Sequence, residues 1–502
     1  MSRWFFRWFG LALLVSGASQ PAASQSVLTL RSYSEAVLLA DETLASRRIE
    51  IDIAGADLRG ARGAFEPSAF IQGRRDRSNV ENTAQERLQR GLSNSFDSRV
   101  TDFKTGIATR TVTGAEVELA YRIDRYRNNL QPQSLYGREF RSVVGVSVTQ
   151  PLLRGAGRTY NRAPIDAAEY DERIAGEVYR QTIQQRLVEA VTSYIALQEA
   201  TERASLLQSS LEVAEQLVRT AERMTAAGAR AGNTVVEAIA FRDIRRVQLE
   251  QARQDMIEAR SAMRALLLAP NGRLGAGLAP DPATVGTVAP IPDRRLVVPE
   301  ASVIRDLAFE RRPETRIAAL RLSRDAIRVA AAENQVLPQL DVNARYDLDG
   351  LSDSAQSSVG RAAGGPNRVW GLGIEFRLPL QGNQRARADV DSARLRRDQS
   401  ELALSAARQR IANDVESTRE SATVALRQLS SQRALLGSQR DLLRLAETQA
   451  EGGRISSVEM LRRRLELLQA EEQLLARRAA AYRAHYAIAF SAGRLAEELE
   501  AE

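Results

Sequence analysis

Two long stretches in the second half of the chain place hydrophobic residues at helical spacing and contain no proline. In residues 457–492 the apolar positions alternate steps of four and three: Leu461, Leu465, Leu468, Leu475, Ala479, Tyr482, Tyr486 and Ala489. Only Glu472 interrupts this series. In residues 383–449 the apolar positions lie seven apart, at Val415, Ala422, Leu429, Leu436 and Leu443. This spacing predicts two helices with a coiled-coil seam, joined by a turn at 451–456.

The first half of the chain repeats this unit. A helical stretch rises from Arg158 to about Met224, a turn follows at 227–234, and a second stretch returns to Leu268. Its seam positions are Ile183, Leu187, Ala190, Tyr194, Leu197, Leu249, Ala252, Met256, Ala259, Met263 and Leu266. At about 1.5 Å rise per residue, each rising stretch spans on the order of 100 Å, well beyond an ordinary globular helix. The sequence therefore predicts a tandem duplication of one long helical hairpin.

Two shorter stretches before the second hairpin alternate strictly between hydrophobic and polar residues. One side carries residues that we expect to face lipid: Trp370, Leu372, Ile374 and Phe376. The other side carries residues that we expect to face water in a lumen: Asp341, Asn343, Arg345, Glu375 and Arg377. Strands with one apolar and one charged face are typical of a transmembrane β-barrel with a water-filled interior.

The first half has corresponding strands near 69–76 and 143–149, with additional sequence between them. This addition contains a candidate hairpin, 107–113 and 116–126 around Gly114, which either adds two barrel strands or decorates an outer loop. Each chain then supplies about four strands, or six. Because about eight strands make the smallest closed membrane barrel, several chains must combine, and three copies of four strands would close one. The predicted fold class is mainly α, with long helical hairpins forming an α-barrel continuous with a membrane β-barrel.

Composition restricts the compartment and the partners. The chain has 502 residues and no cysteine, which excludes disulfides, zinc–thiolate sites and a lipid anchor on an N-terminal cysteine. A basic start, a short apolar run and small residues match a secretory signal peptide, cleaved between about Ala18 and Gln25. The net charge is +7, but the arginines alternate with acidic residues along the helices, so no nucleic-acid partner is expected.

The sequence lacks the residue patterns of the common enzyme classes. His485 is the only histidine and stands beside the seam residues Tyr482 and Tyr486, where packing explains it better than catalysis. No histidine cluster for a metal, no Gly-x-x-x-x-Gly-Lys-Ser/Thr phosphate loop and no nucleophile elbow occur in the sequence. We therefore expect no catalytic residue, no metal site and no cofactor.

The order of these features resembles the TolC-type outer-membrane efflux proteins. The resemblance rests on the duplicated hairpins, on Gln-Pro-Leu-Leu-Arg-Gly at 150–155, on Leu-Pro-Leu-Gln-Gly at 378–382 and on Arg-Arg-Pro-Glu at 311–314. It implies a homotrimer whose β-barrel lies in outer-membrane lipid and whose helical barrel crosses the periplasm. It also implies an exit duct for tripartite efflux or type I secretion, docked to a periplasmic adaptor (membrane fusion protein) and an inner-membrane pump of the RND, ABC or MFS type. No particular cargo is implied among drugs, metal ions, polypeptides and polysaccharides.

Both hairpin turns contain glycine, which permits left-handed backbone at a helix end. By the resemblance, these turns are the tips that contact the adaptor, formed by Gly228, Arg230, Gly232, Gly452, Gly453 and Arg454. Arg454 matches an arginine that helps to close the periplasmic mouth, and Glu459 matches an acidic residue that rings it after insertion of one residue. The chain departs from the family pattern at Arg462, which stands where a second acid is expected. Glu237 is the candidate acidic partner in the first hairpin.

These interpretations divide the chain into nine segments. They are a signal peptide at 1–25, first-repeat short helices at 26–64, first-repeat strands at 65–152, the first long hairpin at 153–269, a linker at 270–302, a second-repeat short helix at 303–337, second-repeat strands at 338–380, the second long hairpin at 381–495 and a tail at 496–502. We expect the linker to lie as a strap across the helices rather than as a free tether. The alternative function is a non-conducting periplasmic coiled-coil or adaptor protein. That alternative accounts for the helices but not for strands with one hydrophobic and one charged face.

Overall fold

The structure, a computed structural model, describes residues 28–130, 138–227, 233–267, 288–290, 296–365 and 367–501. The chain forms two compact units, and each unit combines segments that are distant in sequence. One unit contains 183–308 and 414–502 together with the N-terminal residues up to 42, and the other contains 43–182 and 309–413. The predicted signal peptide and most of the predicted linker lie outside the described residues.

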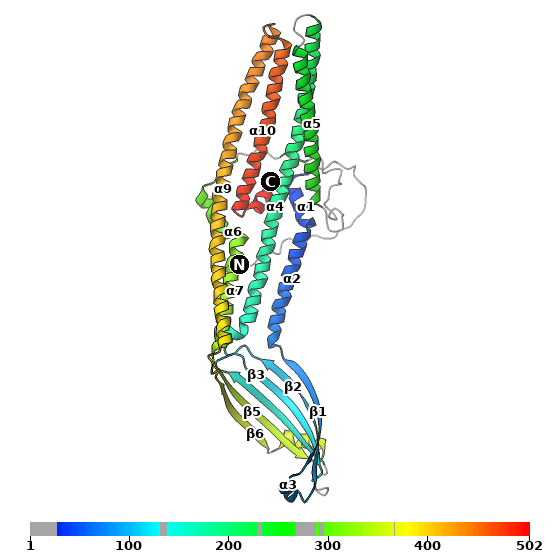
Figure 1. Cartoon of the computed structure of the whole chain (residues 1–502), viewed down its shortest axis with the longest axis vertical. Helices are drawn as coiled ribbons and strands as arrows, with labels where there is room; N and C mark the ends of the chain where they lie inside the picture. Colours follow the sequence, from blue (N-terminus) through cyan, green and yellow to red (C-terminus); the bar gives the residue numbers. More distant parts are fainter. Residues whose placement is uncertain are drawn as a thin grey trace, which may run out of the picture. The chain divides into compact units, whose positions relative to one another are not determined.

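The second unit contains one antiparallel sheet of six strands, whose spatial order follows the sequence (Figure 1). The strands are β1 (Ser68–Glu81), β2 (Ser95–Arg110), β3 (Glu116–Asn128), β4 (Glu139–Pro151), β5 (Gln339–Ser352) and β6 (Arg368–Arg377). The expectation of about four strands is therefore too low, and the six-strand alternative is correct. The candidate hairpin at 107–126 is the end of a longer one, because β2 begins at Ser95. Polar residues on both faces of 95–102 hide the strand alternation in that part of the sequence.

The loop expected at 352–366 contains a helix, α8 (Ala355–Gly364). The hydroxyl of Ser354 caps it by accepting a hydrogen bond from the backbone N–H of Ser357 at 3.3 Å. The helix packs against the strands at Gly350, where a Cβ atom would lie 2.2 Å from the carbonyl oxygen of Ser358. A side chain at this position would therefore push α8 off the sheet.

Both segments predicted as short helices are divided in two. The segment 26–64 contains α1 (Leu30–Ala40) and α2 (Glu42–Arg62), with extended backbone at Asp41 between them. Residues 303–336 form α6 (Ala301–Arg311) and α7 (Pro313–Val336). The proline ring of Pro313 excludes helical backbone at Arg312, whose ψ is 129°, so the break is local in origin.

The long helices have nearly the lengths predicted from the repeat. They are α4 (Arg158–Ala226), α5 (Asn233–Ala265), α9 (Gln384–Glu451) and α10 (Ser457–Ser491), followed by the short α11 (Leu495–Glu500). In the first unit the core contains the predicted seam residues Leu187, Ala190, Tyr194, Leu197, Met263, Ala479, Tyr482, Tyr486 and Ala489. Among the helices of the described residues, none combines the length and hydrophobicity that a membrane-spanning helix requires.

The described part of the linker contacts this core. Val288 forms a parallel bridge with Leu28, and the backbone N–H of Ala289 donates to the carbonyl oxygen of Leu28 at 2.9 Å. The hydroxyl of Tyr194 lies 2.8 Å from the Leu28 carbonyl oxygen and 2.7 Å from that of Ala289. Residues 288–290 therefore lie against α4.

Candidate functional site

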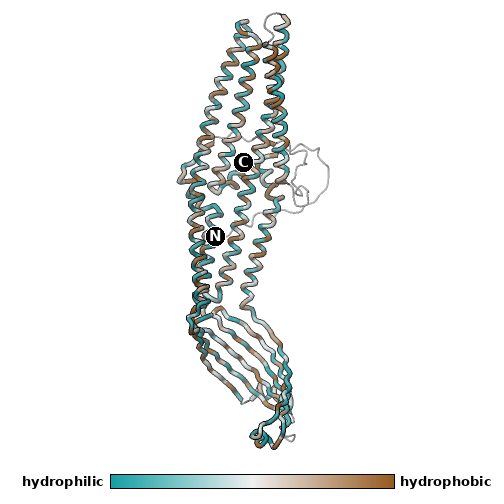
Figure 2. Tube along the Cα trace, in the orientation of Figure 1, coloured by the Kyte–Doolittle hydropathy of each residue, from teal (hydrophilic) through white to brown (hydrophobic). Residues whose placement is uncertain are grey.

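The sheet has one hydrophobic face, which we call the apolar face. Trp370, Leu372, Ile374 and Phe376 of β6 lie on it with 60–75% of their surface exposed. Directly opposite them on β5 are, in the same order, Tyr346, Ala344, Val342 and Leu340. The same rows continue over β4 and β3, where Val146 lies opposite Leu119 and Val148 opposite Val117. Hydrophobic and hydrophilic positions alternate along these strands (Figure 2). In water, such exposure of large side chains would be unfavourable, so this face fits a hydrocarbon environment.

The opposite face of the sheet, which we call the charged face, contains all five residues predicted to face water. Arg345 pairs with Asp347 at 3.2 Å, and Arg377 forms an ion pair with Glu375. Asp341 lies opposite Glu375 in the ladder and accepts a hydrogen bond from Gln339 at 2.6 Å. Asn343 is two residues along the same strand, opposite Gly373. Charges of both signs paired along the strands suit a hydrated surface.

α9 ends, at the turn into α10, with two characteristic backbone hydrogen bonds. The N–H of Arg454 donates to the carbonyl oxygen of Gln449 at 2.8 Å, and the N–H of Gly453 donates to that of Ala450 at 3.0 Å. Gly453 has a φ of +70°, which a residue with a Cβ atom rarely adopts. This pair of bonds is the Schellman arrangement, which satisfies the last carbonyl groups of a helix. The side chain of Arg454 is exposed and forms no ion pair within the described part of the chain.

The start of α10 is fixed by Ser456, whose hydroxyl accepts a hydrogen bond from the backbone N–H of Glu459 at 3.3 Å. The carboxylate of Glu459 lies in the first turn of the helix, where the helix dipole favours a negative charge. It also pairs with Arg463 at 3.3 Å. The side chain of Glu459 is thus held at the start of α10 by its ion pair with Arg463.

The structure brings together two of the four gate candidates, and these two come from different hairpins. Nη2 of Arg462, on α10, lies 2.7 Å from Oε2 of Glu237, on α5. Both side chains are partly exposed, at 37% and 55%. Arg462 departs from the family pattern, and the structure explains this departure, because Arg462 is the cation that pairs with Glu237. The other tip residues, Gly228, Arg230 and Gly232, lie outside the described residues.

A hydrophobic cluster lies next to this ion pair and joins three helices. It consists of Val213, Ala214, Leu217, Val218 and Ala221 of α4, Ala238 of α5, and Val458, Leu461 and Leu465 of α10. Because Val458 and Ala238 are almost completely buried, the first turns of α5 and α10 are anchored to α4. The first turns of both return helices are therefore held by hydrophobic packing.

Sequence reasoning missed a ladder of ion pairs between α4 and α10. Arg483 pairs with Glu199, Arg478 with Glu202, and Arg203 with Glu472 at 3.0 Å. The one available signal was Glu472, which interrupts the hydrophobic seam. The partner of its charge lies on the neighbouring helix, and the pattern of one helix cannot identify that partner.

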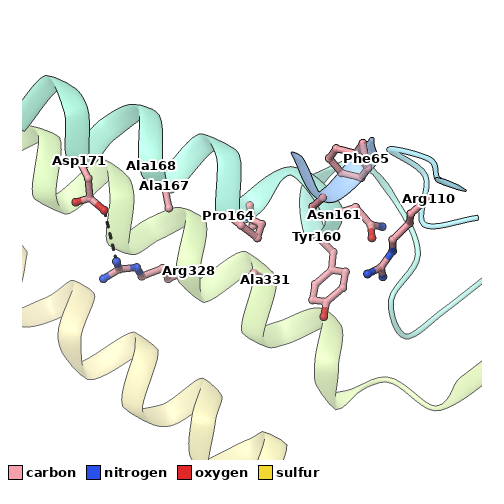
Figure 3. A pocket seen from close by; sticks show the side chains of 12 residues that line it. Phe65, Arg110, Tyr160, Asn161, Pro164, Ala167, Ala168, Asp171, Arg328 and Ala331 are labelled. Carbon is pink, nitrogen blue, oxygen red and sulfur yellow. Dashed lines mark ion pairs between the residues drawn. The ribbon is translucent and has the colours of Figure 1, made fainter. Parts of the chain in front are cut away.

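The second unit contains a cavity of about 510 Å³ where α4 begins (Figure 3). Arg110, Tyr160, Asn161 and Pro164 line it, and Arg328 on its wall lies 3.9 Å from Asp171. Pro164 lies inside the first turns of α4 and has no N–H to donate to the carbonyl oxygen of Tyr160. The described residues contain no group of three or more His, Asp or Glu side chains that could hold a metal ion. His485 contacts Glu498 at 3.2 Å and lies edge-on to Tyr486.

Duplicated long helical hairpins together with a two-faced membrane sheet define a class of outer-membrane channel proteins. The chain belongs to the outer membrane efflux protein family, because that family's model matches residues 116–267 and 304–494. Members of this family are channel proteins of the outer membrane rather than enzymes. Among curated proteins, none matches the chain significantly.

Solved structures have the same fold. A membrane protein from Pseudomonas aeruginosa has a TM-score of 0.62 and 18% identity, with 95% of this chain and 96% of that chain covered. The CmeC outer membrane channel of Campylobacter jejuni has a TM-score of 0.60 and 15% identity, with 92% and 86% covered. The outer membrane protein VceC of Vibrio cholerae has a TM-score of 0.60 and 15% identity, with 92% and 96% covered. At these identities the likeness establishes the fold.

Proposed function

We propose that the chain assembles as a homotrimer and forms the exit duct of a tripartite efflux or type I secretion system. The observation that carries the proposal is the two-faced sheet. Its apolar face requires lipid, its charged face requires water, and its outer strands β1 and β6 have no partner strand within the described chain. A single sheet of six strands is too small to close around water, so copies of the chain must complete the wall.

The helical hairpins then serve as the periplasmic part of the duct. In this proposal the tips, including Gly452, Gly453 and Arg454, dock to a periplasmic adaptor, which links the duct to an inner-membrane pump of the RND, ABC or MFS type. The guanidinium group of Arg454 is exposed and has no ion-pair partner among the described residues, so it is available to another chain, and the family supports such a contact. Export by a cleaved signal peptide without a lipid anchor belongs to the same proposal.

The proposed gate combines links within and between copies. Arg462 and Glu237 hold the two hairpins of one chain together, while Arg454 links to a neighbouring copy and Glu459 contributes negative charge at the mouth. An exposed ion pair contributes about 0.2–1 kcal/mol. Removal of Arg462 alone is therefore expected to raise the open population only a few-fold.

Fractionation and conductance test the duct. The protein is expected to stay in the outer membrane after a high-salt wash, to need detergent for extraction and to form discrete channels in a planar bilayer. A protein that the salt wash releases as a soluble monomer would instead support the non-conducting periplasmic adaptor.

Arg454→Ala tests the gate. We expect a higher single-channel conductance, because the variant removes a link that closes the mouth. Arg444→Ala is the matched control, since Arg444 is an exposed arginine of α9 that pairs with Asp441 on its own helix at 3.4 Å. Equal conductance of wild type and Arg454→Ala would show that Arg454 is not part of the gate, but it would not contradict the proposed duct.

Photocrosslinking in whole cells tests the docking. A photoreactive residue at Gly452 is expected to capture an adaptor, whereas the same probe at Glu420, an exposed position on α9 away from the tip, is not. Capture of the same protein at both positions, or at neither, would argue against docking through the tips.

A further inference from the structure

The hairpin of β1 and β2 continues the sheet without a break in register. β2 pairs with β3 from Ser98 opposite Asn128 to Arg110 opposite Glu116, and β1 pairs with β2 along its whole length. The strands β1 and β2 have 14 and 16 residues, as long as the 13 and 14 of β4 and β5. A hairpin that only decorated a loop would not need such lengths.

Both faces of the sheet continue onto this hairpin. On the apolar face, Ile107 of β2 lies opposite Leu119 of β3, and Ala69 of β1 lies opposite Ile107. On the charged face, Lys104 of β2 forms an ion pair with Glu118 of β3 at 2.7 Å. At this level the added strands continue both faces of the sheet. Beyond Gly73 the same row of β1 carries Arg75 and Arg77, level with Arg125 and Arg127 of β3, so the hydrophobic part of the face ends at the same height on β1 and β3.

Gly106 of β2 allows a close contact between a side chain of β1 and the backbone of β3. A Cβ atom there would lie 2.4 Å from the carbonyl oxygen of Leu119 and 3.0 Å from the ring of Phe70. The absence of a side chain at Gly106 lets the ring of Phe70 and the backbone of β3 approach each other across β2. The ring of Phe70 also lies 5.2 Å from the ammonium group of Lys104.

We propose that β1 and β6 are the two edges that join neighbouring copies, so that the β1–β2 hairpin is part of the barrel wall. The proposal rests on the trimeric duct proposed above and specifies how it is built. Three copies of a six-stranded sheet give eighteen strands, in place of the twelve that four strands per chain would give. At about 4.8 Å between strands and a tilt of about 40°, the backbone diameter rises from roughly 24 Å to roughly 36 Å.

The two edges suit each other in direction and in shape. In a sheet of six alternating strands, β1 and β6 run in opposite directions, so β6 of one copy meets β1 of the next as an antiparallel pair. On the charged face β6 has Gly371 and Gly373, and no atom lies within 4 Å of a Cβ atom built at Gly371. On the same face of β1 stand the longer side chains of Gln72 and Arg74. With the two ends level, Gln72 comes opposite Gly373 and Arg74 opposite Gly371, so small residues on one edge face large ones on the other.

Cysteine pairs test this junction, because the native chain has no cysteine. Ile71 lies three residues from the first residue of β1, and Ile374 lies three residues from the last residue of β6. Both side chains lie on the apolar face, so they meet when the two ends are level. We would combine Ile71→Cys with Leu372→Cys, Ile374→Cys or Phe376→Cys, which covers three registers, and oxidise intact outer membranes with a membrane-permeant catalyst.

The control tests the four-strand barrel. Leu119 lies on the apolar face three residues from the first residue of β3, the strand that would be the edge if β1 and β2 stood outside the wall. Leu119→Cys is therefore combined with the same three positions of β6. We expect reducible dimers and trimers with at least one Ile71→Cys pair and only monomers with every Leu119→Cys pair.

The opposite result, covalent trimers through Leu119→Cys, would overturn the proposal while leaving a trimeric duct intact. Trimers in which no pair couples would overturn it as well, because the three β6 positions cover the level register and a shift of two residues in either direction. A density map of the wild-type trimer, which needs no substitution, is expected to resolve eighteen strands; twelve strands would also reject the proposal. If the wild-type protein is a salt-extractable monomer, the proposed duct itself fails.

Discussion

Arg203 on α4 pairs with Glu472 on α10, with Nε of the arginine 3.0 Å from Oε1 of the glutamate. Glu472 is the one residue that interrupts the hydrophobic seam of α10, and only 21% of its side chain is exposed. The same guanidinium group reaches Asp255 on α5 through Nη1 at 3.1 Å. One arginine therefore joins three helices at the point where hydrophobic packing is interrupted.

Replacement of Arg203 by methionine is expected to lower the free energy of unfolding by about 1–2 kcal/mol, because it leaves two partly buried carboxylates without their cation. Adding Glu472→Leu is expected to recover about half of that loss, since leucine restores the seam. Thermal unfolding followed by circular dichroism measures both. Arg253→Met, which removes an exposed pair with Glu250 on α5, is the control and should change stability by less than about 0.5 kcal/mol. Equal losses for Arg203→Met and Arg253→Met would contradict the interpretation.

Tyr33 predicts a loss of stability at high pH. Its hydroxyl lies 3.1 Å from the carbonyl oxygen of Met263 and 3.0 Å from the hydroxyl of Ser193, and burial raises the pKa of Tyr33 from 10.0 to about 12. Because the folded state holds the proton more tightly, the stabilisation is complete below pH 10 and is lost as the pH rises towards 12. Wild-type stability is expected to fall over this range relative to Tyr33→Phe.

Unfolding at several pH values between 9 and 12 checks this range. At neutral pH, Tyr33→Phe should itself cost about 1 kcal/mol, because the carbonyl oxygen of Met263 loses a donor. Tyr170→Phe is the control, since Tyr170 is a partly exposed residue of α4. If wild type and Tyr33→Phe lose stability in parallel above pH 10, the buried hydroxyl is not the titrating group.

The contacts of Asp325 on α7 lead us to predict that acid lowers the stability of the fold. Burial raises its pKa, but the hydroxyl of Ser400, which donates at 2.6 Å, and the charges of Arg324 and Arg328 more than offset burial and lower the pKa of Asp325 below 3.8. A lowered pKa means stabilisation that is present above pH 3.8 and is lost as the pH falls through the lower folded-state value. Asp325→Asn is therefore expected to cost about 1–3 kcal/mol at pH 7 and less in strong acid.

Melting temperatures at neutral and acidic pH measure this difference. Asp398→Asn provides the comparison, because Asp398 pairs with Arg397 on the surface of α9 with half of its side chain exposed. Asp398→Asn should change the melting temperature little at either pH. A penalty for Asp325→Asn that does not shrink in acid would show that shape, rather than charge, accounts for its effect.

Gly453 at the tip is expected to tolerate a Cβ atom poorly, for conformational reasons alone. Its φ is +70°, and no atom lies within 4 Å of the position that a Cβ would occupy. Gly453→Ala should therefore cost about 1 kcal/mol through backbone strain and weaken the two hydrogen bonds that end α9. Amide hydrogen exchange at Gly453 and Arg454 is expected to become faster.

The neighbouring Gly452 provides the matched control. It lacks a positive φ, and a Cβ there would make ordinary contacts of 3.6 Å and 3.7 Å. Gly452→Ala should leave exchange at the tip nearly unchanged. Equal acceleration by both substitutions would mean that crowding, and not the left-handed conformation, limits this turn.

The sequence by itself determined which positions form the seams of the long helices and where these helices turn. The seven-residue spacing from Val415 to Leu436 and the glycines at 452 and 453 depend on local geometry, so they can be recognised without knowing any neighbour. The alternation from Trp370 to Phe376 likewise identified two faces of a strand. The break at Asp41 escaped the pattern, because a single extended residue hardly changes helical periodicity. The break at Arg312 has a local signal in Pro313, which disfavours helical backbone at the residue before it.

The tertiary structure decided which element covers each face. Arg203 and Glu472 are 269 residues apart, and Arg462 and Glu237 are 225 apart. Periodicity shows that a position needs a partner but not which one, because the partner is chosen by three-dimensional packing. The number of strands was also decided by the tertiary structure. Residues 95–102 carry polar side chains on both faces, so their pattern does not identify them as a strand. Their backbone hydrogen bonds with β1, and from Ser98 also with β3, show that they belong to the sheet.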